Sequence, residues 1–482
     1  MIIIIIMIIA AVIRTYHMRD LAVFLADQAS DSTAVFNILK GDFTLLGPIT
    51  SVGGFYNGPI VYYLMAPIFW IFKSNPLSGT IFQTLIFCFT IPFIYFIGKK
   101  VWNVETGLLA GFIFAISPLM VEYSRAAFNS FPAIFFSTLI IYLLISLQKP
   151  FSNIKLLMIG VFIGWILQMH YFTVAFVLLV SIYPLFRREL FSWKYYLFTM
   201  FGIGIGFAPF LLFEIRHQFL NTHRMIEYFI TAPDDTIRSL NNIFMIWPRV
   251  MGEIIGNNNI FMGLLFFLMI GIYLGNTFHS YKKNHIHILL FLLLFFIVTI
   301  IGAIYGKRLE SHYVISFHTS LIIFFSATMI SLLRKNKLII GVFVFCIMLI
   351  NIPSWGIAAE KHPVQDGLSI KDFTYAASLI HDDNKQQYNV AMHAQGDNRA
   401  MPLRYTLLLL DDHPQHYDTY TNIAQLYFIV PKDEGIQQQT MWEYTAFGPS
   451  RIANIWNINE EYYLYKLEKQ DNNIVIYNSS TH

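Results

Sequence analysis

Two carboxylates in the polar stretch after the first apolar run have a spacing that could support catalysis. Asp27 and Asp31 stand four residues apart in the sequence Asp-Gln-Ala-Ser-Asp. On a helix this spacing puts both side chains on one face, where like charges repel. At a low-dielectric interface such repulsion raises the pKa of one carboxyl, which suits a general base. The spacing equally fits a solvated acidic helix start, so the pair alone leaves both alternatives open.

Other residues with possible chemical roles occur at the ends of apolar runs rather than inside them. Glycine and proline steps around Tyr56 and Asn57 let a backbone approach a ligand closely, or simply shape a loop. The remaining candidates are Arg125, Asn129, His170, Glu214, Arg216, Lys307, Arg308, His312 and Tyr313.

Several of these candidates also have a structural alternative. Arg125 fits an interfacial anchor at a helix end. His170, on an apolar helix, fits a buried histidine whose hydrogen bonds are satisfied. Glu214 and Arg216 are close enough in sequence to pair with each other in solvent. Residue type and position therefore do not separate these roles.

The elements that carry these residues are membrane helices. The 482-residue chain is 56% hydrophobic and only 13% charged, against roughly 25% charged residues in a soluble domain. Apolar runs near the roughly 20 residues that cross a bilayer core recur from Ile2 to Ile350. The net charge of +3 gives no support for nucleic-acid binding. Cys88 and Cys346 fall inside apolar runs and predict no disulfide framework.

The apolar runs predict about 11 transmembrane helices. The run at 1–13 has no basic leader and no small-residue cleavage site, so we expect it to be an uncleaved first membrane helix. A separate run at 56–72 is ambiguous and decides the topology. The other predicted crossings are 80–98, 106–122, 131–148, 156–170, 172–186, 195–213, 259–279, 287–304, 312–332 and 339–353.

The distribution of basic residues favours one topology. If 56–72 lies along the membrane rather than crossing it, alternate short loops hold twelve basic and two acidic residues. Short loops rich in Lys and Arg face the cytoplasm. We therefore expect a cytoplasmic N-terminus in the cell membrane, with the first outer loop 14–79, the loop 214–258 and the tail outside.

The tail predicts a second domain. Residues 1–353 form the membrane domain, whereas 359–482 carry nine basic and sixteen acidic residues and turn sequences such as Gln-Gly-Asp-Asn. A helix is expected at 370–380. Short strands are expected at 388–392, 426–430, 462–467 and 474–477. This pattern predicts a small extracytoplasmic α/β domain.

The position of the charged residues favours an enzyme. A transporter or a flippase for lipid-linked sugars, the alternative from another functional class, would place ionisable groups near the middle of the membrane. Here the helix interiors are nearly free of charge, and charged residues gather at the outer ends. Among them, Lys307 and Arg308 fit snorkelling side chains or ligands for a lipid-linked phosphate. This distribution suits chemistry at the outer membrane interface.

The motifs of the first outer loop resemble a known family. They read Asp-Gln-x-x-Asp, Gly-Asp, Leu-Leu-Gly-Pro and Gly-Gly-Phe-Tyr-x-Gly-Pro-x-x-Tyr-Tyr-Leu. This order resembles bacterial-type family 39 glycosyltransferases, relatives of protein O-mannosyltransferases and of the aminoarabinose transferase of lipid A. The resemblance covers about 1–353 and, more loosely, the tail, and it implies a GT-C fold. It also implies a membrane-hugging helix at 56–72.

The resemblance carries roles onto particular residues. It implies that an acidic residue of the first outer loop is the base, which corresponds to Asp27, with Asp31 as the rival. Gln28 stands where many relatives have Glu. The polar segments at the other outer helix ends would then bind substrate. Metal independence is also implied, and no histidine or third carboxylate stands at ligand spacing from the pair.

The expected reaction moves a sugar from a polyprenyl-phosphate donor to an acceptor at the outer face. Asp27 would deprotonate an acceptor hydroxyl, which attacks the anomeric carbon opposite the phosphate, so that the configuration inverts. Lys307, Arg308 and Arg216 would stabilise the leaving phosphate. The expected partners are the lipid donor, the bilayer, and an envelope glycan, lipid or protein as acceptor, with no cofactor.

Overall fold

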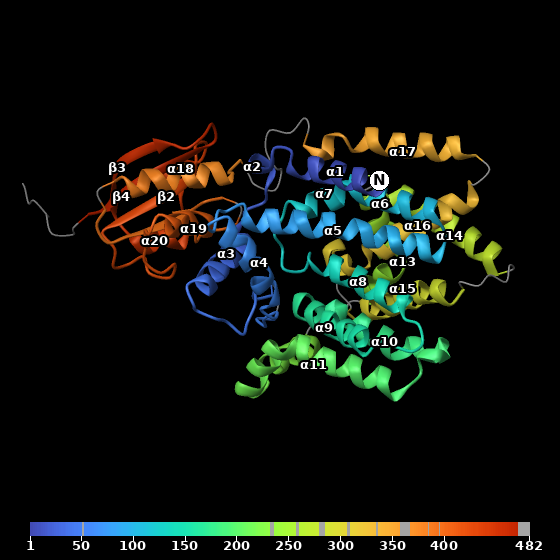
Figure 1. Ribbon diagram of the computed structural model, residues 1–482. Coiled ribbons are helices and arrows are strands. Elements are labelled where there is room, and N and C mark those ends of the chain that lie inside the picture. The colour runs from blue at the N-terminus through green and yellow to red at the C-terminus, as the bar shows by residue number, and fades with distance from the viewer. Residues whose placement is uncertain are drawn as a thin grey trace, which may run out of the picture. The chain divides into compact units, whose positions relative to one another are not determined.

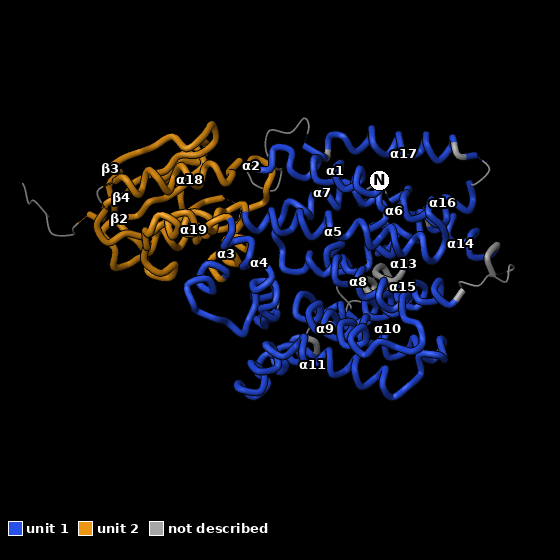
Figure 2. Tube along the Cα trace, viewed as in Figure 1, with its two compact units in different colours: residues 1–18, 35–71, 78–359 blue, residues 19–34, 72–77, 360–482 orange. Residues whose placement is uncertain are grey.

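The chain forms two compact units. The computed structural model describes residues 1–50, 53–231, 236–256, 260–278, 285–305, 309–333, 336–356, 367–383, 385–394 and 396–470. Unit 1 comprises Met1–Met18, Val35–Ile71 and Ser78–Ala359, and unit 2 comprises Arg19–Ala34, Phe72–Leu77 and Glu360–His482 (Figures 1 and 2). Two pieces of the first outer loop therefore belong to the same unit as the tail, which the sequence did not predict.

Every apolar run predicted to cross the membrane contains a helix. Among the described residues, four helices are long and apolar enough to cross a bilayer, or up to six if each bent pair is one crossing. The helices in the predicted runs are α1 (Ile2–Thr15), α5 (Ser78–Val101), α6 (Val104–Ile116), α7 (Pro118–Ser124), α8 (Ala133–Ser146), α9 (Asn153–Met169), α10 (Val174–Phe186), α11 (Trp193–Arg216), α14 (Ile260–Phe278), α15 (His285–Tyr305), α16 (His318–Leu332) and α17 (Lys337–Asn351).

Further helices lie between the apolar runs. The loop predicted at 214–258 is largely helical, with α12 (Leu220–Thr231) and α13 (Thr236–Gly256). In the run at 56–72, α4 (Ile60–Ile71) has 12 residues, a length of about 18 Å, and it is one of several apolar helices of unit 1 that are shorter than a hydrocarbon core of about 30 Å. The short helical turns of unit 1 are η1 (Tyr171–Thr173), η2 (Arg188–Leu190), η3 (Ser311–Phe317) and η4 (Pro353–Trp355).

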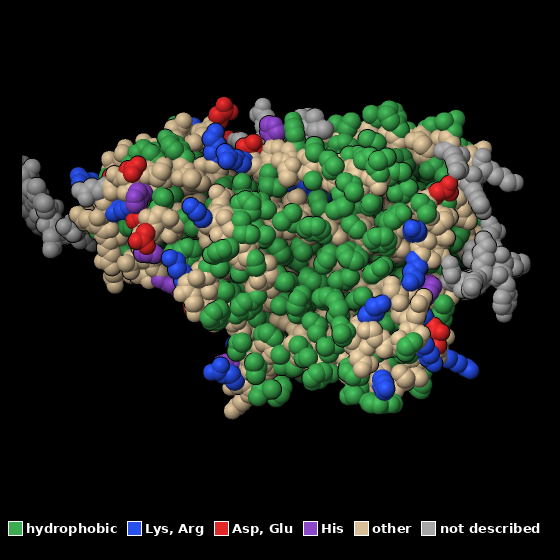
Figure 3. Space-filling view, in the orientation of Figure 1, with side chains coloured by type: hydrophobic (Ala, Val, Ile, Leu, Met, Phe, Trp, Pro, Cys, Tyr) green, Lys and Arg blue, Asp and Glu red, His purple; other side chains and the backbone are tan. Residues whose placement is uncertain are grey.

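The surface of unit 1 is apolar where helices face outward. Hydrophobic side chains cover most of the face of unit 1 seen in Figure 3. Large apolar side chains are exposed on α5, α11 and α17, among them Phe89, Phe201 and Phe345. A soluble protein rarely exposes so much contiguous apolar surface. This surface is that of a protein in contact with lipid.

A buried arginine stabilises a break between two helices of unit 1. The helices α6 and α7 meet at 59° because Pro118 cannot continue the hydrogen-bond ladder of α6. Arg14, which is 0% exposed, donates to the carbonyls of Phe114 at 3.1 Å and Ala115 at 2.8 Å. The Trp355 indole donates to Ile116 O at 2.9 Å. The carbonyls left at the end of α6 are thus satisfied without water.

Glycines bring α9 and α11 into close contact. A Cβ on Gly160 would lie 2.1 Å from Thr199 O, and a Cβ on Gly206 would lie 2.2 Å from Val161 O. Each helix has two such glycines about one turn apart, which are Gly160 and Gly164 on α9 and Gly202 and Gly206 on α11. Small residues at this spacing let the backbones of two membrane helices approach closely. The C-terminal ends of α9 and α11 are therefore placed side by side, and both carry candidate site residues.

Unit 2 contains a four-stranded sheet in the order β1-β2-β4-β3. The strands β1 and β2 are parallel, and α19 connects them (Figure 1), whereas β4 is antiparallel to both of its neighbours. The elements are α18 (Ile370–His381), β1 (Tyr388–Met392), α19 (Met401–Leu409), β2 (Gln425–Pro431), η6 (Ile436–Gln438), α20 (Trp442–Phe447), β3 (Ser450–Asn457) and β4 (Tyr462–Lys469).

The sequence located most but not all of these elements. The predicted helix at 370–380 and the strands at 388–392, 426–430 and 462–467 are confirmed. The predicted strand at 474–477 lies outside the described residues. The strand β3 was missed because it is an edge strand whose residues are mostly exposed on both faces, so it lacks the alternating apolar pattern of a half-buried strand.

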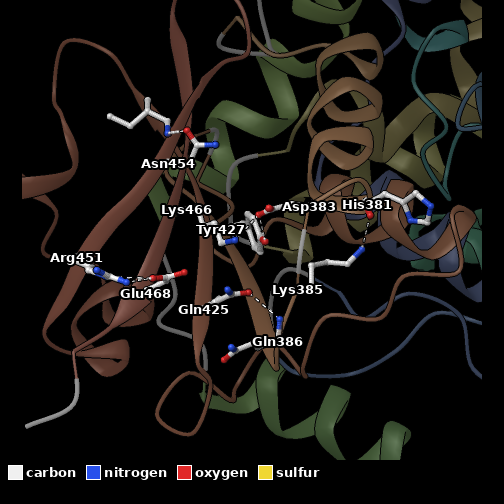
Figure 4. A network of polar contacts seen from close by, with 11 residues as sticks. His381, Asp383, Lys385, Gln386, Gln425, Tyr427, Arg451, Asn454, Lys466 and Glu468 are labelled. Atoms are coloured by element: carbon white, nitrogen blue, oxygen red, sulfur yellow. Dashed lines mark hydrogen bonds and ion pairs between the residues drawn. The ribbon is translucent and has the colours of Figure 1, made fainter. Parts of the chain in front are cut away.

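Polar side chains tie the end of α18 to the sheet (Figure 4). Asp383 accepts a hydrogen bond from the Tyr427 hydroxyl at 2.7 Å and lies 2.7 Å from the Lys466 ammonium. Asp412 lies 2.6 Å from both Lys385 and His381. The pKa of Asp412 is lowered because the hydrogen bonds and charges of Lys385 and His381 outweigh the opposing effect of burial. These contacts fix α18 on β2 and β4.

Candidate active site

The predicted carboxylate pair lies at the start of α3 (Ala26–Leu39). Asp27 is exposed, whereas Gln28 and Asp31 are 3% and 5% exposed. Protein atoms packed around the Asp27 carboxyl raise its pKa. The raised pKa agrees with the expectation, but desolvation is its cause, and the charge of Asp31 is not. The two acids lie on the same helix, but the Asp27 residue is exposed and the Asp31 residue is buried.

Gln28 stabilises the start of this helix. Its side-chain oxygen accepts the backbone N–H of Leu25 at 3.0 Å, and the carbonyl of Leu25 accepts Ala29 N–H at 3.0 Å. A glutamine at this position thus closes the first turn in the manner of a capping box. Gln28 positions Asp27, because both lie in the turn that this contact closes.

The glycine-rich motif of the first loop forms a tight hairpin. Gly47 N–H donates to Asn57 O and Asn57 N–H donates to Pro48 O, each at 2.9 Å. Gly53 and Gly54 have φ of +70° and +63°, which side chains with a Cβ rarely adopt. The glycines of the motif therefore serve the turn, which presents Tyr56 and Asn57.

An asparagine and a tyrosine clamp the backbone of Tyr56. The amide of Asn221 accepts from Tyr56 N at 2.6 Å and donates to Tyr56 O at 2.9 Å. The Tyr171 hydroxyl also donates to Tyr56 O, at 2.5 Å. Sequence reasoning missed Asn221 and Tyr171, although a polar residue beside apolar segments needs a partner. The hairpin is thereby held against α12 and the end of α9.

Residues 168–171 join the separate candidate segments of unit 1. The carbonyl of Gln168 accepts Gly58 N–H at 2.9 Å. The carbonyl of Met169 accepts the Asn129 amide at 3.2 Å, and Tyr171 binds Tyr56 as above. Three of these four residues thus connect the hairpin and the loop that contains Asn129 to the end of α9.

Aromatic rings surround the remaining residue of this segment. The His170 ring centroid lies 5.1 Å from that of Tyr313, and the His312 ring lies 4.6 Å from the same tyrosine. Phe128 lies 5.9 Å from His312. Hence the predicted residues His170, His312 and Tyr313 do come together, in a cluster of a kind that stacks on apolar sugar faces.

Glu214 is buried and does not face its expected partner. It is 2% exposed, and its Oε2 accepts the backbone N–H of Thr222 at 3.0 Å and also the Thr222 hydroxyl. Arg216 is exposed at the end of α11. Glu214 therefore does not form the solvent-exposed pair with Arg216 that the sequence left open.

Several side-chain oxygens of unit 1 are buried without a hydrogen-bond partner among the described residues, and three of them belong to the hairpin and to the last turns of α9 and α11. They are Asn57 Oδ1, Gln168 Oε1 and Glu214 Oε1. A buried acceptor without a donor is costly. A ligand that brings hydroxyl groups would satisfy such oxygens, whereas a phosphate, which only accepts at its charged oxygens, would not.

Arg125 contacts the protein's own backbone. It is 2% exposed, and its guanidinium donates to Ile13 O at 2.7 Å, Trp355 O at 2.8 Å, Tyr16 O at 3.3 Å and Arg14 O at 3.4 Å. These contacts show that Arg125 holds the end of α1. This role is similar to the structural alternative, in which Arg125 anchors a helix end. Lys307 and Arg308 lie outside the described residues.

The candidate residues divide between the two units. Asp27, Gln28 and Asp31 belong to unit 2, and the described candidates from Tyr56 to Tyr313 belong to unit 1.

Comparisons with known proteins are consistent with this architecture. Residues 56–213 match the model of a family described as dolichyl-phosphate-mannose-protein mannosyltransferase. An uncharacterized protein of Aquifex aeolicus (strain VF5) is 30% identical over 200 residues, which cover 36% of this chain. The match spans 44% of that relative, less than half of its length. The matched family segment begins at Tyr56, after the acidic pair.

Solved structures share the fold over almost the whole chain. ArnT from Cupriavidus metallidurans in the apo state has a TM-score of 0.63 at 10% identity, covering 96% of this chain and 97% of that one. The same protein bound to undecaprenyl phosphate has a TM-score of 0.60. The apo oligosaccharyltransferase of Archaeoglobus fulgidus has a TM-score of 0.54 at 11% identity, covering 90% and 69%.

Proposed function

We propose that this chain is a GT-C membrane glycosyltransferase that transfers a sugar from a polyprenyl-phosphate donor to an acceptor hydroxyl; the family match of residues 56–213 and the fold shared with ArnT support this class. The observation that carries this proposal is the joining of the predicted polar segments of unit 1 through residues 168–171. The ArnT structure bound to undecaprenyl phosphate supports the class of donor.

The chemistry needs one base and a stabilised leaving group. Asp27 takes the proton of the acceptor hydroxyl while that oxygen forms a bond to the anomeric carbon. The bond between this carbon and the phosphate oxygen breaks, and the electron pair leaves with the polyprenyl phosphate. Attack from the face opposite the phosphate inverts the anomeric configuration. The raised pKa makes the Asp27 carboxylate a stronger base than that of an ordinary aspartate, which favours this role.

The polar residues of unit 1 suit the sugar, and the cations suit the phosphate. Asn57 and Glu214 present unpaired acceptor oxygens, which sugar hydroxyls can satisfy. The rings of His170 and Tyr313 offer a stacking surface. Lys307, Arg308 and Arg216 remain our proposed ligands of the donor phosphate, because guanidinium and ammonium groups stabilise the charge of a leaving phosphate.

We further propose eleven membrane crossings, with a cytoplasmic N-terminus and unit 2 residues 360–482 outside. This topology is supported by the distribution of basic residues, which favours a position of α4 along the membrane rather than across it. A protease-cleavable tag placed after the last residue should be cut in intact cells. Protection of that tag until the cells are lysed would reverse the topology.

The test of function is a transfer assay with the purified full-length protein in lipid nanodiscs. A panel of polyprenyl-phosphate sugars is offered, and the acceptor pool is analysed by mass spectrometry for an added sugar. Asp27→Asn should abolish transfer by the active donor, and Glu227→Gln, which changes an exposed acid on α12, should not. Full activity of Asp27→Asn together with loss in Asp31→Asn would move the base to Asp31. No transfer from any donor would contradict the function.

A further inference from the structure

The tail of the chain contacts both outer-loop pieces of unit 2 through one side chain. Tyr405 on α19 is 0% exposed, and its ring lies 5.7 Å from that of Phe24. Its hydroxyl donates a 2.6 Å hydrogen bond to the carbonyl of Ser74. Phe24 and Ser74 are themselves 2% and 6% exposed. The two contacted segments, 19–34 and 72–77, share unit 2 with residues 360–482 (Figure 2).

Phe24 is connected through the backbone of the next residue to the helix turn that carries the proposed base, Asp27. It precedes Leu25, whose N–H and C=O both bond to the first turn of α3 through Gln28 and Ala29. The position of the Phe24 ring therefore sets where the turn that carries Asp27 begins.

The contact at Ser74 holds a strained turn. Lys73 and Ser74 have φ of +52° and +58°, and residues other than glycine rarely adopt this left-handed region because of steric strain. Asn75 N–H bonds to Phe72 O at 3.1 Å, and Leu77 N–H bonds to the Asn75 side chain at 3.0 Å. The Tyr405 hydroxyl is the bond that ties this turn to α19.

Tyr405 is itself firmly placed. Its neighbour Arg404 donates to Asn389 Oδ1 at 2.6 Å and to Val390 O at 3.1 Å, which fixes α19 on β1. Asp397 accepts the N–H of Met401 at 2.9 Å at the start of the helix. Burial raises the pKa of Tyr405, so its hydroxyl keeps its proton and remains a donor. A rigid donor and ring thus face two loop segments.

We propose that Tyr405 is a positioning residue through which the C-terminal residues 360–482 hold the Asp27 turn in place for catalysis. This role of the tail in catalysis rests on the proposed function, because it requires that Asp27 is the catalytic base. The tail then acts on the rate of the chemical step and leaves the affinity for the donor unchanged.

The first experiment does not depend on activity. Hydrogen exchange of the full-length protein in nanodiscs is followed by mass spectrometry for peptides within 19–34 and 72–77. Tyr405→Leu removes the ring and the donor, and we expect exchange in both segments to rise about tenfold. The matched control is Tyr427→Phe, which removes a 2.7 Å bond to Asp383 in the same unit (Figure 4) and should leave both segments unchanged. Unchanged exchange in Tyr405→Leu, or an equal rise in the control, overturns the proposal.

The second experiment separates positioning from general damage. With whichever polyprenyl-phosphate sugar proves active, Tyr405→Leu should lower kcat by about tenfold to a hundredfold with KM little changed. Tyr405→Phe keeps the ring against Phe24 and should recover most of kcat. An unchanged kcat in Tyr405→Leu, or loss of binding instead, refutes positioning. A further outcome is that Asp27→Asn proves active while hydrogen exchange still rises in Tyr405→Leu. In that outcome the assigned base is wrong, and the proposed role of Tyr405 in catalysis is wrong as well. The contact between the loop segments and the tail would then be structural only.

Discussion

The carboxylate of Glu214 accepts the backbone N–H of Thr222 at 3.0 Å, joining the last turn of α11 to the first turn of α12. Between them Gln218 and Phe219 adopt φ of +54° and +61°. The carboxylate therefore closes a turn of unfavourable backbone conformation. The next residue back from Thr222 is Asn221, which clamps Tyr56.

This relationship predicts separate effects for two substitutions of Glu214. Glu214→Leu removes the acceptor of Thr222 and should lower the thermal midpoint, reflecting a loss of about 1–3 kcal/mol. It should also raise KM for the donor, since the Tyr56 clamp loosens. Glu214→Gln keeps an acceptor oxygen and should retain most of the stability. Thermal unfolding in detergent and steady-state kinetics measure the two effects, and equal stability of all three proteins would contradict the role.

The raised pKa of Asp27 predicts the pH dependence of transfer. The base must be deprotonated, so the rate should fall as pH drops through the pKa of this carboxyl. Because that pKa is raised by desolvation, the acidic limb should lie at higher pH than the titration of an ordinary aspartate. A profile of kcat/KM measured at fixed ionic strength gives the midpoint. A flat profile through this range would exclude Asp27 as the base.

The contacts of Arg125 predict that it supports stability rather than donor binding. Lys has a single side-chain nitrogen, which cannot replace both Nη2, the donor to Ile13, Tyr16 and Trp355, and Nε, the donor to Arg14. Arg125→Lys should therefore lower the thermal midpoint, since each buried carbonyl left unpaired costs about 1–3 kcal/mol. Arg188→Lys, at an exposed site on η2, should have little effect. An unchanged midpoint with a raised KM would instead assign Arg125 to the substrate.

The close approach of α9 and α11 predicts a contrast between two glycines. The Cβ in Gly206→Ala would lie 2.2 Å from Val161 O, whereas nothing lies within 4 Å of a Cβ on Gly204. Gly206→Ala should cost about 1–3 kcal/mol through overpacking. Gly204→Ala, on the same helix, should be neutral or slightly stabilising because alanine favours the helix. Similar thermal midpoints for both variants would contradict the packing.

Chelation tests whether a metal takes part. No group of three or more His, Cys, Asp or Glu side chains able to hold a metal ion occurs in the described part of the chain. We therefore expect transfer to persist after treatment with EDTA and removal of the chelator. Loss of transfer that is restored by Mn²⁺, Mg²⁺ or Zn²⁺ would show that a metal supplies part of the catalysis.

Much of the fold followed from local features of the sequence. Apolar runs predicted the membrane helices because the length of such a run is a property of one segment. The strands β1, β2 and β4 were found for a similar reason, as short apolar runs bounded by turn residues. The exposed edge strand β3 has no such pattern and was missed. The outer helix ends were recognised as candidate sites because charge was absent elsewhere.

The partners of those candidate residues came only from the tertiary structure. Tyr56 meets Tyr171 and Asn221, which are more than a hundred residues away in sequence, and Arg125 meets Trp355. The i, i+4 spacing of Asp27 and Asp31 left a coupled pair and a solvated helix start open, and packing exposes one acid and buries the other.

The sequence by itself thus determined which segments are helices, which polar residues stand at their ends, and which family the first outer loop resembles. The tertiary structure decided what each polar residue touches, and it grouped part of that loop with the tail. The physical reason is that secondary structure depends on neighbours in sequence, whereas burial and hydrogen-bond partners depend on how distant segments pack. Asp27 was identifiable as an acid at a helix start, but the contacts of Phe24 and Tyr405 that position its turn were not.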